Sequence, residues 1–478
     1  MDLQDREFGR RAARLPIHGV GLSVDVYTPE LLELYGALAQ TALKPDYLEV
    51  FKAPAAELAR IRQALPDMRF AYHAEGLWLI DPDMRSRYPW VEETQKMARH
   101  ARALGSGWVN HECASKQFAG YSFGTYLPPL MTRAGAEATA ANAGLCQQLL
   151  DQSFGSAVGG EAPLLLLELP PLTYFGFGDL SVAEFFAHIA CEAPCGFVLD
   201  IGHLWTQWRY REHPRHASLE SFADAFLEQF PLHRVVQVHL AGLCSARGPD
   251  EQDSRWIDTH AAPVPKLLWS LLDRVLAHPG LSALKGIALE VDTKAISLVT
   301  EEFGELGKHC GMLSPRQAID QPLPPSKRRP MAPSPAADLA GMYGTYARVV
   351  AGQQPLENSA LEPLAEDLDC EGLRQYCTQY LPNELHHWGG DLEELFPKIT
   401  RVLKERGVGQ NDFVRFWFRH PYAVKEPYDF FYIKLDRWIE FVHARAPDLS
   451  EEAQRESMAL RALHAEFNDE PLAVPGAE

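Results

Sequence analysis

The sequence lacks any apolar run long enough to cross a membrane. A spanning helix needs about 20 consecutive apolar residues, and the apolar runs in this chain are far shorter. The first residues, MDLQDREFGRRAARLP, are charged and carry no hydrophobic signal-peptide core. Only 8 cysteines occur in 478 residues, and their scattered positions argue against a secreted fold stapled by disulfides. We therefore expect a cytoplasmic protein that has no membrane partner.

Positive charge is also scarce. The chain has 45 Lys and Arg residues against 64 Asp and Glu residues, for a formal net charge of −19. Such a field repels polyphosphate, and the first 312 residues contain no basic stripe that would offset it locally. We therefore expect no nucleic-acid partner. The sequence also lacks a glycine-rich phosphate loop and a nucleophile elbow, so these two kinds of enzyme receive no support.

Eight short apolar runs, separated by stretches with helical spacing, dominate the first part of the chain. Several runs are apolar over four or five consecutive residues, as expected of strands buried on both faces. Alternating strands and helices imply a parallel sheet, and eight such units fit a TIM barrel. The fold class expected is thus α/β, with a TIM (β/α)8 barrel over residues 1–312. The eight runs are His18–Val26, Tyr47–Phe51, Phe70–Gly76, Gly107–Ala114, Leu164–Pro171, Gly196–His203, Val235–Gly242 and Gly286–Asp292.

The remainder of the chain divides into a linker and a second domain. The segment Ser314–Asp338 has seven prolines in 25 residues, a composition typical of an extended tether. We place the linker at 313–338 and a small, mainly α-helical C-terminal domain at 339–478, where apolar and aromatic residues recur at helical spacing. A tether of this kind would let the second domain reach the mouth of the barrel.

Nine side chains that can bind metals stand at or just beyond the ends of the apolar runs. In a TIM barrel these ends meet at one mouth, where the chemistry takes place. A mixture of imidazole and carboxylate suits divalent iron, zinc or manganese, and a carboxylate directly after an apolar run is costly to bury without a cation. One strand-end histidine alone is more often structural, but nine such residues in this order predict a multinuclear metal site. They are His73, His111, Glu168, Asp200, His203, His239, Asp258, His260 and Glu290.

Four of the expected ligands form two pairs that are close together in the sequence. Asp200 and His203 form a D-x-x-H motif as the sixth run ends, so both side chains should face the mouth. Asp258 and His260 form a D-x-H motif that we place in a loop, where a spacing of two lets both side chains point the same way. Glu168 is placed to bridge neighbouring ions.

Several motifs together give the chain a resemblance to a known family. The order of ligands is similar to that of the xylose-isomerase-like metal barrels, including the endonuclease IV type with three metal ions. Within that superfamily, residues 15–300 resemble the DUF692 family, the multinuclear non-haem iron-dependent oxidases (MNIO) of methanobactin-type peptide biosynthesis. The motifs are GVGLSVD, DYLEVF, HAEGL, GTYLPPLMT, LLLELPPLTY, GFVLDIGH, VVQVHLAG, WIDTHAAPV and ALEVD. The chain departs from the family pattern at Leu169, His203 and Leu243.

The resemblance implies a cofactor, a reaction and a partner. It implies two or three iron ions of mixed Fe2+ and Fe3+ state, with O2 as co-substrate, acting on cysteines of a ribosomal precursor peptide. One ion would be held by His73, His111 and Glu168, and another by His203, Asp258 and His260. The ion expected to carry the catalysis would be held by Glu168, Asp200, His239 and Glu290.

The C-terminal segments DLEELFPKITRVLKERG, DFVRFWFRHP and YDFFYIKLDRWIEFV weakly resemble the helical partner proteins of these oxidases. The resemblance therefore implies a partner domain fused in cis, which would carry the peptide substrate to the barrel.

Two alternatives stay open at this point. An endonuclease IV-like phosphodiesterase with three zinc ions would use nearly the same ligands, although the acidic charge opposes it. A xylose-isomerase-like sugar isomerase or epimerase with one divalent ion would leave several of the nine residues unexplained.

Overall fold

A computed structural model shows the fold of the chain. It describes residues 3–27, 29–41, 44–155, 161–171, 174–213, 215–245, 256–258, 260–310, 338–422 and 429–467. The linker expected at 313–338 lies outside these ranges except for Asp338.

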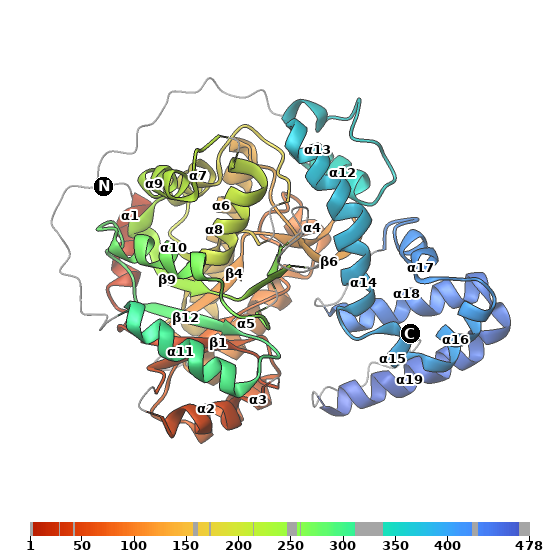
Figure 1. Cartoon of the computed structure of the whole chain (residues 1–478), viewed down its shortest axis with the longest axis horizontal. Helices are drawn as coiled ribbons and strands as arrows, with labels where there is room; N and C mark the ends of the chain where they lie inside the picture. The colour runs from red at the N-terminus through yellow and green to blue at the C-terminus, as the bar shows by residue number, and fades with distance from the viewer. Residues whose placement is uncertain are drawn as a thin grey trace.

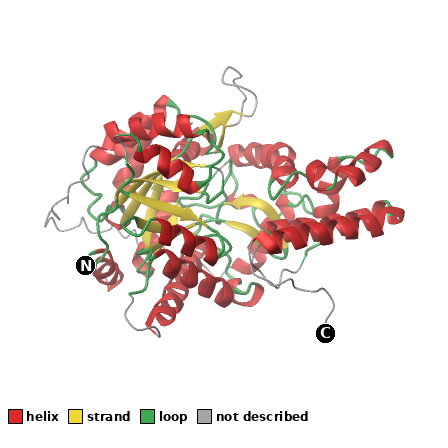
Figure 2. Ribbon diagram, turned by 90° about the horizontal axis from the view of Figure 1, so that it is seen from below, coloured by secondary structure: helices red, strands yellow, loops and turns green. Residues whose placement is uncertain are grey.

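Eight parallel strands form a closed barrel, surrounded by helices in Figures 1 and 2. Around the barrel the order is β1-β12-β9-β8-β7-β4-β3-β2. Each of the eight apolar runs supplies one strand, so the expected TIM barrel is confirmed. The strands are β1 (Gly19–Val24), β2 (Tyr47–Phe51), β3 (Arg69–His73), β4 (Trp108–Glu112), β7 (Leu164–Glu168), β8 (Gly196–Asp200), β9 (Val235–Leu240) and β12 (Gly286–Val291).

Helices form the outer layer of the barrel. They bury one apolar stripe each; α7, for example, begins at a capping box in which Ser181 and Glu184 bond each other's backbone N–H groups. The helices of this layer and its connections are α1 (Leu3–Ala12), α2 (Leu31–Ala39), α3 (Ala55–Ala64), α4 (Met84–Arg87), α5 (Trp90–Leu104), α6 (Arg133–Gly155), α7 (Val182–Glu192), α8 (Ile201–Gln207), α9 (Leu219–Gln229), α10 (Lys266–Ala277) and α11 (Ile296–Cys310).

The barrel interior is apolar in its lower half and polar above. Alternate residues of each strand point inward, and the lower inward positions form a separate apolar cluster that includes Tyr47, Trp108 and Val198. Phe8 of α1 belongs to the same cluster, so this helix closes the N-terminal end of the barrel. Between the two halves, Gln237 accepts a hydrogen bond from Trp108 Nε1 at 2.9 Å and donates one to Tyr47 Oη at 3.1 Å.

Two antiparallel hairpins, which we did not expect from the sequence, extend from the mouth. One pairs β5 (Ser115–Phe118) with β6 (Tyr121–Leu127), and the other pairs β10 (Leu243–Ser245) with β11 (Trp256–Asp258). Asp258 therefore ends a strand paired with Leu243 and does not lie in a loop, which corrects the expectation. The hairpins follow β4 and β9, so both rise from the C-terminal side of the barrel.

The C-terminal region is helical, as expected. Figure 1 shows its helices gathered beside the barrel. They are α12 (Leu339–Val350), α13 (Asp367–Gln375), α14 (Leu381–His387), α15 (Leu392–Leu395), α16 (Pro397–Glu405), α17 (Gln410–Trp417), α18 (Phe430–Arg445) and α19 (Ser450–Phe467).

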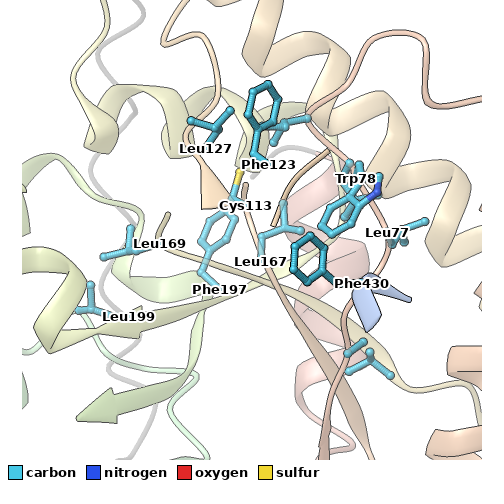
Figure 3. Packing of buried hydrophobic residues seen from close by; sticks show 14 of the residues in the cluster. Leu77, Trp78, Cys113, Phe123, Leu127, Leu167, Leu169, Phe197, Leu199 and Phe430 are labelled. Carbon is cyan, nitrogen blue, oxygen red and sulfur yellow. The ribbon is translucent and has the colours of Figure 1, made fainter. Parts of the chain in front are cut away.

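These helices pack directly on the β5–β6 hairpin and the loops beside it. Tyr346 donates a hydrogen bond to the carbonyl of Pro128 at 3.2 Å, and Trp417 Nε1 donates one to the carbonyl of Ser122 at 2.6 Å. Phe430 lies among buried barrel residues in Figure 3, and its ring faces Gly124 of β6. The helical region and the barrel therefore share one continuous apolar core.

Two expectations from composition can be compared with the structure. Among the described residues, no helix is both long and apolar enough to cross a membrane. The seven cysteines whose side chains are described are all free thiols.

Candidate metal centre

Four of the nine expected ligands meet at the C-terminal mouth of the barrel. Glu168, Asp200, His239 and Glu290 end or nearly end β7, β8, β9 and β12, and each offers one ligand atom within 4.8 Å of the other three. All four are buried, with exposed fractions of 4% or less. Strand ends of a closed barrel converge here, which is why residues up to 122 positions apart in the sequence form one cluster.

The imidazole of His239 is oriented by a carboxylate from another strand of the barrel. Glu49 of β2 is fully buried, and its Oε1 lies 2.8 Å from His239 Nε2. The other ring nitrogen, Nδ1, then faces Glu290 Oε1 at 3.1 Å and Glu168 Oε1 at 3.4 Å. An outer carboxylate that holds one nitrogen so that the other faces a metal is the usual arrangement for a histidine ligand.

His73 joins the cluster from β3. Its Nδ1 lies 3.3 Å from the carbonyl of Ala74, while Nε2 points to Glu168 Oε2 at 3.4 Å and Glu112 Oε1 at 3.8 Å. Burial alone would lower the pKa of His73, but the carboxylates of Glu112 and Glu168 outweigh it and raise this pKa to about 10. The carboxylates therefore create a strong demand for positive charge at this position.

His203 lies in the first turn of α8 and His260 follows β11, and each is oriented by its Nδ1. That atom of His203 lies 2.9 Å from the carbonyl of Leu169, and that of His260 lies 3.1 Å from Asp292 Oδ2. His260 Nε2 is 3.5 Å from Glu290 Oε2. His260 is thus held with Nε2 toward Glu290, and His203 approaches the cluster with its Nδ1 3.7 Å from both Glu168 Oε1 and Asp200 Oδ1.

Two expected ligands differ from these. The backbone of Asp258 is described in β11, but its side chain lies outside the described part of the structure. His111 is turned away from the cluster: its Nε2 accepts the backbone N–H of Leu77 at 3.0 Å, and its Nδ1 lies 2.9 Å from the carbonyl of Glu112. Burial lowers the pKa of His111 to about 4, so the ring is neutral. His111 therefore does not meet the other expected ligands in this structure, because the residue has the outward phase of β4.

The residues fit a group of cations. Glu49, Glu112, Glu168, Asp200 and Glu290 place five carboxylates in one buried layer. Within the described part of the chain, Glu112 Oε2 and Glu290 Oε2 accept no hydrogen bond. Buried carboxylates are stable only when cations or donors compensate their charge. Imidazole together with carboxylate is a donor set for iron, zinc or manganese.

A lysine and an aromatic residue flank the centre. Lys116 of β5 forms an ion pair with Glu75, two residues after His73, and Lys52 lies 3.8 Å from the same carboxylate. Burial tends to raise the pKa of Glu75, but Lys116 and Lys52 lower it to about 2. Trp388, from the helical region, has its ring centroid 4.6 Å from the Lys116 ammonium and is 44% exposed.

The fold and the site define a TIM barrel with a candidate multinuclear metal centre at its C-terminal mouth. Comparison with known proteins makes the assignment more specific. The chain belongs to the family described as "RiPP precursor modification enzyme MbnB/TglH/ChrH", whose model matches residues 33–306. The expected family is thereby confirmed.

Individual relatives match over shorter stretches. The chain is 30% identical over 155 residues to a UPF0276 protein of Caulobacter sp. (strain K31), covering 32% of this chain and 48% of that one. It is 25% identical over 242 residues to a UPF0276 protein of Bordetella pertussis, covering 45% and 76%. The chain thus spans about half the length of the first of these relatives. Among solved structures, endonuclease IV from Thermus thermophilus matches with 20% identity and a TM-score of 0.37, covering 60% of this chain and 99% of that one.

Proposed function

We propose that this protein is an iron-dependent oxidase that uses dioxygen to modify cysteine residues of a ribosomally made precursor peptide. Family membership supports a peptide-modifying enzyme. The observation that carries the proposal is the buried layer of carboxylates and imidazoles at the mouth, since such a layer requires several positive charges. When bound, iron would supply a centre that can bind a thiolate and reduce oxygen.

The residues of the chain have separate tasks in this proposal. Glu168 lies between His73 on one side and His239 on the other, at 3.4 Å from each, so it can bridge two ions. Asp200 caps α8 by accepting the backbone N–H of His203 at 2.5 Å, which keeps both residues at the mouth. Glu49 and Asp292 orient the rings of His239 and His260.

We further propose that the helical region is a built-in partner that presents the peptide. The region is packed on the β5–β6 hairpin at the mouth, and Trp388 reaches Lys116, whose partner Glu75 follows His73 closely in the chain. A peptide bound along this side would be close to the metal layer. Because the region is packed against the barrel, it would act as a fixed wall of the site, and no excursion on a tether is needed.

Metal analysis after anaerobic purification tests the proposal most directly. We expect two or three irons per chain, oxygen consumption that depends on the peptide, and no product from a peptide with serine in place of the reactive cysteine, because serine lacks the thiolate. Zinc with phosphodiesterase activity would favour the endonuclease alternative, and one manganese or magnesium ion would favour the isomerase alternative. Either result, or turnover that is unchanged without oxygen, would refute the oxidase assignment.

The role of the helical region needs a separate test. Removing the whole region would uncover the fully buried side chains of Phe118 and Phe123 on the β5–β6 hairpin, so a truncated barrel would report on folding as well as on function. Trp388→Ala avoids this problem because the side chain is 44% exposed. We expect KM for the peptide to rise while the iron content stays the same. Leu463→Ala on α19, which changes a side chain of 65% exposure, is the matched control. Equal KM values for both variants and the unmodified chain would refute the peptide contact.

A further inference from the structure

On β4, the residue on the same face as Glu168 is Glu112 and not its neighbour His111, which the sequence predicts as a ligand. The inward positions of this strand are Trp108, whose side chain belongs to the interior cluster, and then every second residue after it. Asn110 follows this phase and donates a hydrogen bond to Glu168 Oε2 at 2.5 Å. Glu112 is the next inward residue and is the register partner of Glu168 on β7. His111 lies between them and faces the outer layer.

Both ring nitrogens of His111 have backbone partners. One ring nitrogen accepts a hydrogen bond from the backbone of Leu77 at 3.0 Å, and the other lies 2.9 Å from the carbonyl of Glu112. The side chain is completely buried, and the Trp78 ring meets it edge-on with 6.1 Å between the centroids. To bind an ion, the imidazole would have to break both hydrogen bonds and cross to the other face of the strand. Its contacts instead fix the loop that follows β3.

Glu112 has the opposite set of properties. Its Oε1 lies 3.8 Å from His73 Nε2, and that same nitrogen is 3.4 Å from Glu168 Oε2. The residue is 8% exposed, and within the described part of the chain its Oε2 has no hydrogen-bond partner. The ammonium of Lys116 forms its ion pair with Glu75. Glu112 is therefore a buried carboxylate with one oxygen beside an imidazole and the other without a donor, an arrangement that a nearby cation would stabilise.

The geometry points to a second ion site formed by His73, Glu112 and Glu168, in which Glu112 takes the place expected for His111. The site would share Glu168 with the cluster of Asp200, His239 and Glu290. Its donor set is one imidazole and two carboxylates, which is harder than two imidazoles and one carboxylate. It therefore favours iron or manganese over softer ions such as copper. The assignment rests on the metal centre of the proposed function but not on the reaction carried out there.

Paired substitutions on adjacent residues test this assignment. The full chain is reconstituted anaerobically with Fe2+, desalted, and assayed for iron per chain by mass spectrometry and for ferrous and ferric sites by Mössbauer spectroscopy. We expect Glu112→Gln to bind one ion fewer than the unmodified chain and to lose one Mössbauer component. His111→Gln should keep the full complement, because the side chain at this position is not required as a ligand, although the melting temperature should fall.

A third variant separates ligand loss from misfolding. Glu112→His places a nitrogen ligand at the inward position, so it should retain the ion that Glu112→Gln loses, with altered Mössbauer parameters. A full complement in Glu112→Gln, or one ion lost from folded His111→Gln, would overturn the assignment. Failure of Glu112→His to recover the ion would also count against it. If the unmodified chain binds no iron, the proposed function fails. If the unmodified chain binds iron and Glu112→Gln binds just as much, only the assignment of Glu112 fails.

Discussion

Adding one methyl group at Gly124 should measure how tightly the helical region is held against the barrel. Gly124 lies in β6 with φ +69, and a Cβ atom there would stand 2.5 Å from the tip of the Phe430 ring. Phe430 is 5% exposed and packs on Trp417 with 5.6 Å between ring centroids, so the ring has little room to retreat. Gly124→Ala therefore combines backbone strain with a clash between barrel and helical region.

A second glycine provides a matched control for the strain. Gly407 follows α16 with φ +74, and a Cβ there meets nothing within 4 Å. The left-handed conformation costs an alanine roughly 1–2 kcal/mol at either position, and the gain from stiffening the unfolded chain is common to both. Overpacking adds about 1–3 kcal/mol in a close-packed interface. Gly124→Ala should thus lose about 1–3 kcal/mol more free energy of unfolding than Gly407→Ala.

Urea denaturation followed by tryptophan fluorescence and by circular dichroism measures the two losses. Phe430→Leu, which removes the ring tip, should couple to Gly124→Ala, so that the double variant loses less stability than the sum of the single variants. Equal losses for the two glycine variants, together with additive effects in the double-mutant cycle, would show that the packing of Phe430 on β6 does not hold in solution. The fixed-wall role of the helical region would then lose its support.

Three further predictions concern the metal layer, the pH dependence and the loop that carries Trp388. Glu168→Ala should lose the most iron of any single substitution, because this carboxylate bridges the two groups of ligands; retention of all ions, measured by mass spectrometry, would contradict it. Burial lowers the pKa of His100 from its usual 6.5 to about 3, so the folded state binds fewer protons than the unfolded state, and stability present above pH 6.5 is lost as the pH falls. The free energy of unfolding should be about 2 kcal/mol lower at pH 5 for this reason. Urea denaturation at several pH values should show that His100→Gln lacks this dependence; if its pH profile matches that of the unmodified chain, His100 is not the source. Lys434 Nζ donates hydrogen bonds to the carbonyls of His386, Trp388 and Gly390 at 2.6, 2.9 and 2.5 Å. Lys434→Met leaves these carbonyls without a donor, so it should lower the free energy of unfolding by about 2–4 kcal/mol. It should also shift the fluorescence emission of Trp388, and the shift must be absent when Lys434→Met is made in the Trp388→Phe variant.

The barrel could be predicted from the sequence because its signals are local. Each buried parallel strand leaves a continuous apolar run, and each strand end carries a polar residue that helices cannot cover. Glu168, Asp200, His239 and Glu290 were found in this way, and the structure brings them together. The position of a residue at the end of a strand was therefore enough to identify most of the candidate centre.

The structure differs from the expectation where position at a strand end was used without the phase of the strand. His111 and Glu112 both stand at the end of β4, and position at a strand end does not distinguish them. Counting by twos from Trp108 would have assigned Glu112 to the interior and His111 to the outer layer. Glu49 shows the same effect of phase: it precedes the end of β2, but its side chain faces inward, toward His239.

The two hairpins and the docking of the helical region could not be predicted in this way. The docking contacts join residues more than 200 positions apart, such as Tyr346 with Pro128 and Trp417 with Ser122. Helical spacing shows that an apolar face must be buried, but it does not show against what. The proline-rich segment suggested two independently moving bodies, whereas the described helices pack into the core of the barrel.

Among the described residues, the interior of the barrel is filled beneath the candidate metal centre. Beneath that centre, Trp108, Tyr47 and Gln237 fill the interior, and Phe8 of α1 blocks the opposite end. In the proposed function, dioxygen, water and peptide would then have to arrive from the mouth, which the helical region borders. A bound peptide would then separate the ions from solvent. If peptide bound first, oxygen would reach ions that already have a thiolate beside them; if oxygen arrived first, it would reach ions without substrate.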